Sequence, residues 1–83
     1  MRLDKYLKVS RLIKRRTVAN DACDGGRVSV NGRVQRASYD VKVGDEITIM
    51  FGVKPLSIKV TEVKETVRKD DAKLMYEVIK QNE

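Results

Sequence analysis

The sequence lacks the residues on which many enzymes and metalloproteins depend. Its 83 residues include no histidine and no tryptophan, and only one cysteine and one proline. The absence of histidine excludes histidine-based acid–base or nucleophilic catalysis, and with a single cysteine it argues against a metal site. Cys23 cannot form an intramolecular disulfide, and we interpret it as a small buried hydrophobic side chain. We therefore expect no catalytic residue, no metal and no cofactor.

Aromatic residues and long apolar runs are also scarce. Three tyrosines and one phenylalanine are too few for a large platform on which the bases of single-stranded nucleic acid could stack. No segment approaches the roughly 18 consecutive apolar residues that a membrane-spanning helix needs. We expect a cytoplasmic protein without a membrane partner.

The length predicts one small domain, residues 1–83. Hydrophobic residues make up 41% of the chain and charged residues 36%, as in a globular protein with a small core and a charged surface. No catalytic domain would fit beside a binding domain, so we predict that the protein is not an enzyme.

Positive charge is concentrated at the amino terminus. Residues 1–16 hold seven of the 18 basic and one of the 12 acidic residues, whereas the other 67 residues hold eleven of each sign. The whole net charge of +6 therefore belongs to this stretch. Its cations are Arg2, Lys5, Lys8, Arg11, Lys14, Arg15 and Arg16.

Two short helices are predicted in the first third of the chain. From Arg2 to Ser10 the less polar residues Leu3, Tyr6, Leu7 and Ser10 recur at helical spacing, and Lys5, Lys8 and Arg11 fall outside that stripe. A second helix is predicted after Thr17, which suits an N-cap. Its Asn20 should face water, Gly25 and Gly26 should end it, and its apolar side should comprise Val18, Ala19, Ala22 and Cys23.

From Arg27 the pattern changes to strands. Val28 and Val30 alternate with polar residues, and the Asn31-Gly32 pair that follows is typical of a hairpin turn leading into Arg33 and Val34. Further strands are predicted at 46–51 and 56–60, with Pro55 in the connection between them. Asp70 is predicted to cap a short helix that runs to Met75, and residues 76–79 could extend this helix or be extended. The order predicts an α+β fold, with two short helices packed on a small, mainly antiparallel sheet.

A dense basic patch on a helix and its following loop is suited to a nucleic-acid backbone. An acidic protein, an anionic membrane or a merely solvated helix face would also be compatible with these charges. RNA is favoured over DNA because the helices are short and no long major-groove recognition helix is present.

Four motifs strengthen the RNA interpretation: R-L-D-K-Y-L (2–7), R-R-T-V-A (15–19), G-R-V-S-V-N-G (26–32) and V-K-V-G-D (41–45). Their series resembles the S4-type RNA-binding domain over residues 1–51, and it implies that family's alpha-L arrangement of two helices and a hairpin. Residues 52–83 would complete the domain with a strand and a short helix. Together, the basic cluster and the resemblance predict nine RNA-contacting residues: Arg2, Lys5, Lys8, Arg11, Lys14, Arg15, Arg16, Asn31 and Arg33.

A closer resemblance covers the whole chain. The amino-terminal seventeen residues and the R-K-D-D-A-K-L-M-Y run at 68–76 are similar to the stand-alone S4 proteins of bacterial ribosome-associated quality control, the RqcP family. The related S4-containing heat-shock proteins carry a long basic C-terminal extension that this chain lacks. The resemblance implies binding to large-subunit rRNA and peptidyl-tRNA on obstructed subunits, in support of alanine tailing by RqcH. We expect a monomer away from the ribosome. A general rRNA-binding assembly or translation factor is the alternative.

Overall fold

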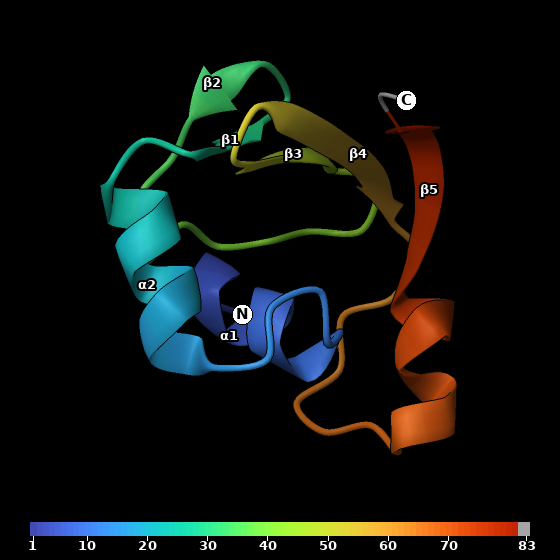
Figure 1. Cartoon of the computed structure of the whole chain (residues 1–83). Coiled ribbons are helices and arrows are strands. Elements are labelled where there is room, and N and C mark those ends of the chain that lie inside the picture. The colour runs from blue at the N-terminus through green and yellow to red at the C-terminus, as the bar shows by residue number, and fades with distance from the viewer. Residues whose placement is uncertain (82–83) are drawn as a thin grey trace.

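The computed structural model describes residues 1–81 and has two layers (Figure 1). One layer is an antiparallel five-stranded sheet in the order β2-β1-β3-β4-β5, and two α-helices cover one of its faces. The predicted α+β class is confirmed. In chain order the elements are α1 (Leu3–Val9), α2 (Arg16–Asp24), β1 (Val28–Val30), β2 (Arg33–Val34), β3 (Glu46–Phe51), β4 (Lys54–Val60), the 3-10 helix η1 (Lys69–Met75) and β5 (Tyr76–Gln81).

The first helix forms as predicted, because its less polar stripe packs into the core. The four residues of that stripe are at most 1% exposed: Leu3, Tyr6, Leu7 and Ser10. The backbone leaves the helix at Arg11, which has a left-handed φ of 63°. Arg11 thus takes the position at a helix end where glycine is most common.

The second helix differs from the prediction in its start and in the positions of Val18 and Asn20. It begins at Arg16 and no side chain caps it, so the prediction of Thr17 as N-cap was wrong. Val18 is 49% exposed, whereas Asn20, expected to face water, turns toward Asp4 and donates to its carboxylate at 3.1 Å. The other three residues predicted on the apolar side are buried in the core: Ala19, Ala22 and Cys23.

The end of the second helix and the hairpin turn lie where the sequence predicts. A glycine ends the helix, and an Asn-Gly pair forms the turn. Gly26 has φ of +81° and donates to the Cys23 carbonyl at 3.1 Å, which satisfies one of the free carbonyls of the last helical turn. In the hairpin, Asn31 and Gly32 have φ of 52° and 85°. Two positive φ angles are what a tight turn between right-twisted strands requires.

The last third of the chain holds the main departures from the prediction. Pro55 lies within β4, opposite Met50 of β3, rather than in a connection. It is tolerated because β5 pairs with β4 only from Leu56 onward, so within residues 1–81 no strand on that side requires an N–H from Pro55. Asp70 does not cap the helix that runs to Met75. This helix is the 3-10 helix η1, which is preceded by Arg68 and already contains Asp70. Residues 76–81 form β5, which decides between the two alternatives for this segment.

The carboxyl-terminal segment is part of the core. Met75 is fully buried, and its carbonyl accepts a hydrogen bond at 2.7 Å from the hydroxyl of buried Tyr6 in α1. Val63 and Val67, in the irregular stretch before η1, also pack against the core. The end of the described chain is therefore attached to its beginning. No helix within residues 1–81 has the length and apolar character to cross a bilayer.

Candidate nucleic-acid interface

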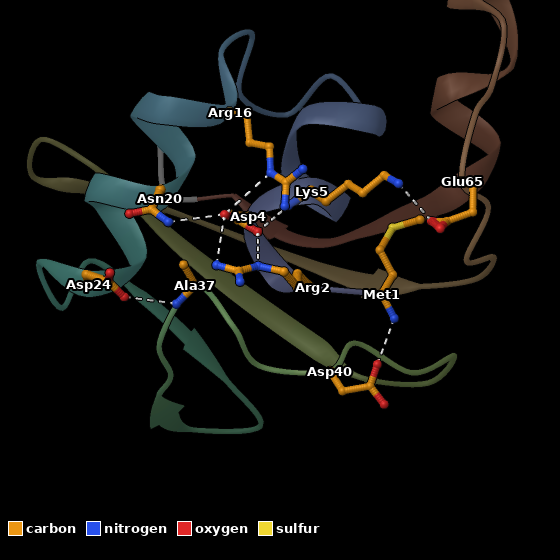
Figure 2. A network of polar contacts seen from close by, with 10 residues as sticks. All are labelled: Met1, Arg2, Asp4, Lys5, Arg16, Asn20, Asp24, Ala37, Asp40 and Glu65. Carbon is orange, nitrogen blue, oxygen red and sulfur yellow. Dashed lines mark hydrogen bonds and ion pairs between the residues drawn. The ribbon is translucent and has the colours of Figure 1, made fainter.

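Asp4, the one acidic residue of the basic amino-terminal stretch, joins the starts of the two helices (Figure 2). Its side chain is 3% exposed and accepts the Lys5 backbone N–H at 2.8 Å, within α1. Arg2 Nε donates to the same carboxylate at 3.2 Å. From α2, Asn20 Nδ2 donates to it at 3.1 Å, and Arg16 Nε lies 3.5 Å away. One buried carboxylate thus holds two arginines from different parts of the chain.

The electrostatics of this cluster keep Asp4 ionised. Burial by itself raises the pKa of the Asp4 carboxyl. Hydrogen bonds from Asn20, from Arg2, from the Lys5 amide and from Arg16 outweigh that effect and bring the pKa below the ordinary value of 3.8. At neutral pH the carboxylate is therefore charged and can hold both guanidinium groups.

The two arginines remain accessible although Asp4 holds them. The side chain of Arg2 is 50% exposed and that of Arg16 47% exposed. A guanidinium carries five N–H donors in a planar fork. Among the contacts within residues 1–81, Arg16 meets a carboxylate through Nε alone and Arg2 through Nε and one terminal nitrogen. The outward edge of each fork is thus oriented and can bind a phosphate.

The start of α2 adds a second source of positive potential. Because no side chain caps this nine-residue helix, its first-turn N–H groups form a site that attracts anions. The helix start opens onto a hollow of about 310 Å³, which is lined by Arg16, Thr17 and Asn20 and by two acids, the buried Asp4 and the exposed Asp21. Arg15, directly before the helix, is also exposed. Fixed cations and free backbone donors meet at this place.

The other predicted cations extend this surface along α1 and into the loop. Lys5 lies 3.2 Å from Glu65, so its charge is partly compensated. Lys8, Arg11 and Lys14 are exposed at the end of α1 and in the loop. Seven of the nine predicted residues therefore lie on α1 or directly before it, on the loop after it and at the start of α2, and we call them the basic face: Arg2, Lys5, Lys8, Arg11, Lys14, Arg15 and Arg16.

Asn31 and Arg33 lie apart from the basic face. Figure 1 shows β2 beyond the carboxyl-terminal end of α2, whereas Arg16 begins that helix. A nine-residue helix is about 13 Å long. Asn31 also uses both ends of its amide internally, since Nδ2 donates to Asp45 at 3.1 Å and Oδ1 accepts from the Glu46 N–H at 3.0 Å. RNA contact by these two residues remains a prediction.

Two residues important to the basic face were not predicted. Asp4 stood out as the only acid among seven bases, yet its sequence position does not say that it is buried or what it binds. Asn20 carried no signal, because its inward orientation depends on Asp4 of another helix.

Cys23 is buried as predicted, and burial raises its pKa to about 12. No group of three potential ligands within residues 1–81 is placed to hold a metal ion.

Comparison with known proteins agrees with this geometry. Residues 1–47 match the S4 domain. The chain is 58% identical over 81 residues to the RQC P-site tRNA stabilizing factor of Halalkalibacterium halodurans, covering 98% of this chain and 92% of that protein. The chain belongs to the RqcP family of S4-domain proteins. The RQC P-site tRNA stabilizing factor of Bacillus subtilis is 54% identical, over 98% of this chain and 94% of that protein.

Solved structures place the fold beside other S4 proteins. The trimeric structure of heat shock protein 15 from Vibrio cholerae has a TM-score of 0.89 and 30% identity, covering 95% of this chain and 81% of that one. The solution structure of the hypothetical protein HP1423 has a TM-score of 0.81 and 31% identity, covering 99% of this chain and all of that one. The fold of this chain is thus shared with these two proteins.

Proposed function

We propose that this protein is a non-enzymatic RNA-binding factor of bacterial ribosome-associated quality control that stabilises tRNA in the P site of large ribosomal subunits. The observation that carries the proposal is near-full-length identity above 50% to proteins named RQC P-site tRNA stabilizing factor. The basic face supports it physically, because clustered arginine and lysine side chains on a rigid support suit RNA phosphates.

In this proposal the basic face lies between large-subunit rRNA and the peptidyl-tRNA. Two RNA backbones repel each other at close range, and cations placed between them lower that repulsion. The arginines held by Asp4 would donate to phosphates with a fixed orientation, so little side-chain freedom is lost on binding. RqcH would act on the same subunit and add alanine residues to the stalled chain. A protein that only neutralises and positions RNA needs no catalytic group.

Affinity purification of the tagged protein from bacterial cells tests this function. We expect the tagged protein to recover large subunits that carry peptidyl-tRNA, together with RqcH. Arg16→Ala should lower this recovery about tenfold, since a charge-assisted hydrogen bond to phosphate is lost. Its thermal midpoint should change little, because an ion pair that is half exposed contributes about 0–1 kcal/mol. Lys59→Ala, at an exposed position of β4 between buried Ile58 and Val60, removes one charge outside the basic face; it is the control and should leave recovery unchanged.

A general role in ribosome assembly is the competing function, favoured only by the generic chemistry of a basic face. Recovery of assembly precursors or of vacant large subunits alone would reject the quality-control role in its favour. Loss of recovery with Lys59→Ala as well as Arg16→Ala would show that net charge, rather than the basic face, determines binding.

A further inference from the structure

A second group of cations gathers in a hollow at the other end of α1. The hollow has a volume of about 440 Å³ and lies between the end of α1, the following loop and the start of η1. All four side chains that line it are basic and exposed: Lys8, Arg11, Lys14 and Lys69. Three belong to the basic face, but Lys69 comes from the last part of the chain.

Carboxylates lie near these four cations, since Glu65 lines an adjoining hollow with Lys8 and Arg11 and two acids follow Lys69 in η1, but in the described part of the chain none is paired with them. Within residues 1–81 none of them forms an ion pair, whereas Arg2 and Arg16 share Asp4 and Lys5 has Glu65. The negative end of the helix dipole favours Lys8 in the last turn of α1. That effect does not explain the three other cations, which repel each other across the hollow. A bound anion would remove the repulsion.

The backbone conformation of Arg11 also favours a bound anion in this hollow. Its left-handed φ of 63° is unfavourable for a residue with a side chain, and a glycine would avoid that cost. An arginine at this position has a physical reason if its guanidinium is used. The hollow is where that side chain lies.

Lys69 is held in position by contacts between η1 and α1. The Tyr6 hydroxyl donates to the Met75 carbonyl at 2.7 Å, at the end of η1. Before η1, Val67 packs against the core and Glu65 pairs with Lys5 at 3.2 Å. Both ends of the segment that carries Lys69 are therefore attached to the helix that carries Lys8. The hollow is formed by folding and does not depend on one mobile side chain.

We propose that this hollow binds a backbone phosphate of RNA and that Lys69 completes it. The site lies at the opposite end of α1 from the two arginines held by Asp4, so the protein would grip RNA at two separate points. The inference rests on the proposed RNA binding and deepens it, by giving the carboxyl-terminal third of the chain a direct part in recognition. The phosphate could come from tRNA or from rRNA, and the test distinguishes the two.

The test compares Lys69→Gln with Lys73→Gln in the full chain. Both variants remove one charge from η1, but Lys73 does not line the hollow. Binding is measured over a series of salt concentrations to two probes, an anticodon stem-loop hairpin and vacant large ribosomal subunits. One phosphate contact contributes about 0.7–0.9 to the slope of log K against log salt, or about five- to eightfold in affinity at 0.1 M salt relative to 1 M.

We expect Lys69→Gln to lose about five- to eightfold in affinity on at least one probe, with a slope shallower by about 0.7–0.9. Loss on the hairpin identifies tRNA as the source of the phosphate, and loss on the subunit identifies rRNA. Lys73→Gln should stay within about twofold of the unchanged protein, and both variants should keep its thermal midpoint. If Lys69→Gln behaves like Lys73→Gln on both probes while the unchanged protein binds, the hollow is rejected and RNA binding stands. If the unchanged protein binds neither probe, both proposals fall.

Discussion

At the scale of single residues, the basic face depends on one buried acid. Asp4 removes one full charge from a surface otherwise suited to polyanions, and in exchange it fixes Arg2 and Arg16 relative to each other. Cations on flexible side chains lose rotamer freedom when they bind, whereas cations already held in position lose less. Asp4 therefore lowers the net charge of the basic face but restricts the side-chain conformations of the two arginines that it contacts.

Asp4→Asn separates charge from geometry. The substitution raises the net charge by one, so simple attraction would strengthen RNA binding. We expect weaker binding, about three- to tenfold, because two arginines lose their common acceptor. The free energy of unfolding should fall by about 1–3 kcal/mol, since partly buried donors lose a charged partner. For a domain of this size each kcal/mol corresponds to roughly 4–8 °C in thermal midpoint.

Glu77→Gln, on exposed β5, makes the same change in charge and serves as the control. Tighter binding by Asp4→Asn would show that the arginines need no fixed partner. The variant should also differ at acid pH. Because the folded pKa of Asp4 is lowered, its stabilisation is complete above the ordinary value of 3.8 and is lost as pH falls through the folded pKa. Below about pH 4 the unchanged protein should therefore lose stability more steeply than Asp4→Asn.

At the scale of elements, the features that depend on a few neighbouring residues could be predicted from the sequence. The stripe in α1, the glycine after α2 and the Asn31-Gly32 turn each depend on a few consecutive residues, and all three were predicted correctly. The sequence does not decide whether residues 76–79 extend the preceding helix or are extended, because Y-E-V-I fits either conformation. The pairing of β5 with β4, from Val60 to Leu56, decides the conformation, and that partner is distant in the sequence.

Tyr6→Phe tests whether α1 holds the carboxyl-terminal elements. The substitution removes the hydroxyl that meets the Met75 carbonyl and leaves that buried acceptor without its partner. We expect a loss of about 1–2 kcal/mol in the free energy of unfolding. Amide hydrogen exchange should accelerate first in η1 and β5, because the lost contact anchors these elements locally.

Tyr39→Phe provides the comparison, since its hydroxyl donates to Asp45 at 3.0 Å on a different part of the molecule. It should also destabilise the fold but leave exchange in η1 close to that of the unchanged protein. Equal acceleration throughout the molecule with Tyr6→Phe would mean that the contact stabilises the fold as a whole and does not act as a local anchor.

At the scale of the whole molecule, the charge is segregated. The part of the interface that is contiguous in sequence, residues 2–16, could be predicted because helical spacing places its cations outside the apolar stripe. Lys69 could not be predicted, because only the packing of η1 brings it beside Lys8. The separation of Arg33 from Arg16 could not be predicted either, because it depends on α2 lying between them. Contiguous cations were found from the sequence, and those assembled by tertiary structure were not.

Segregated charge predicts a steep salt dependence. If about five phosphates are neutralised, log K should fall against log salt with a slope of roughly −3.5 to −4.5. The measurement is equilibrium binding of the unchanged protein to large subunits over a salt series at constant pH. A slope near zero would mean that hydrogen bonds to bases or apolar contacts, rather than phosphates, supply the affinity.

The contact between Tyr6 and Met75 also has a consequence for how the protein is made. The two residues are 69 positions apart, so the helix with most of the basic face emerges early in synthesis and its buried partner late. Until then the inner stripe of α1, including Leu3 and Tyr6, has no complete core to cover it, and long-range contacts form slowly. The core that supports the basic face is complete only after translation has passed Met75. A nascent copy with η1 still in the exit tunnel would carry the cations on a helix whose buried side is not yet covered.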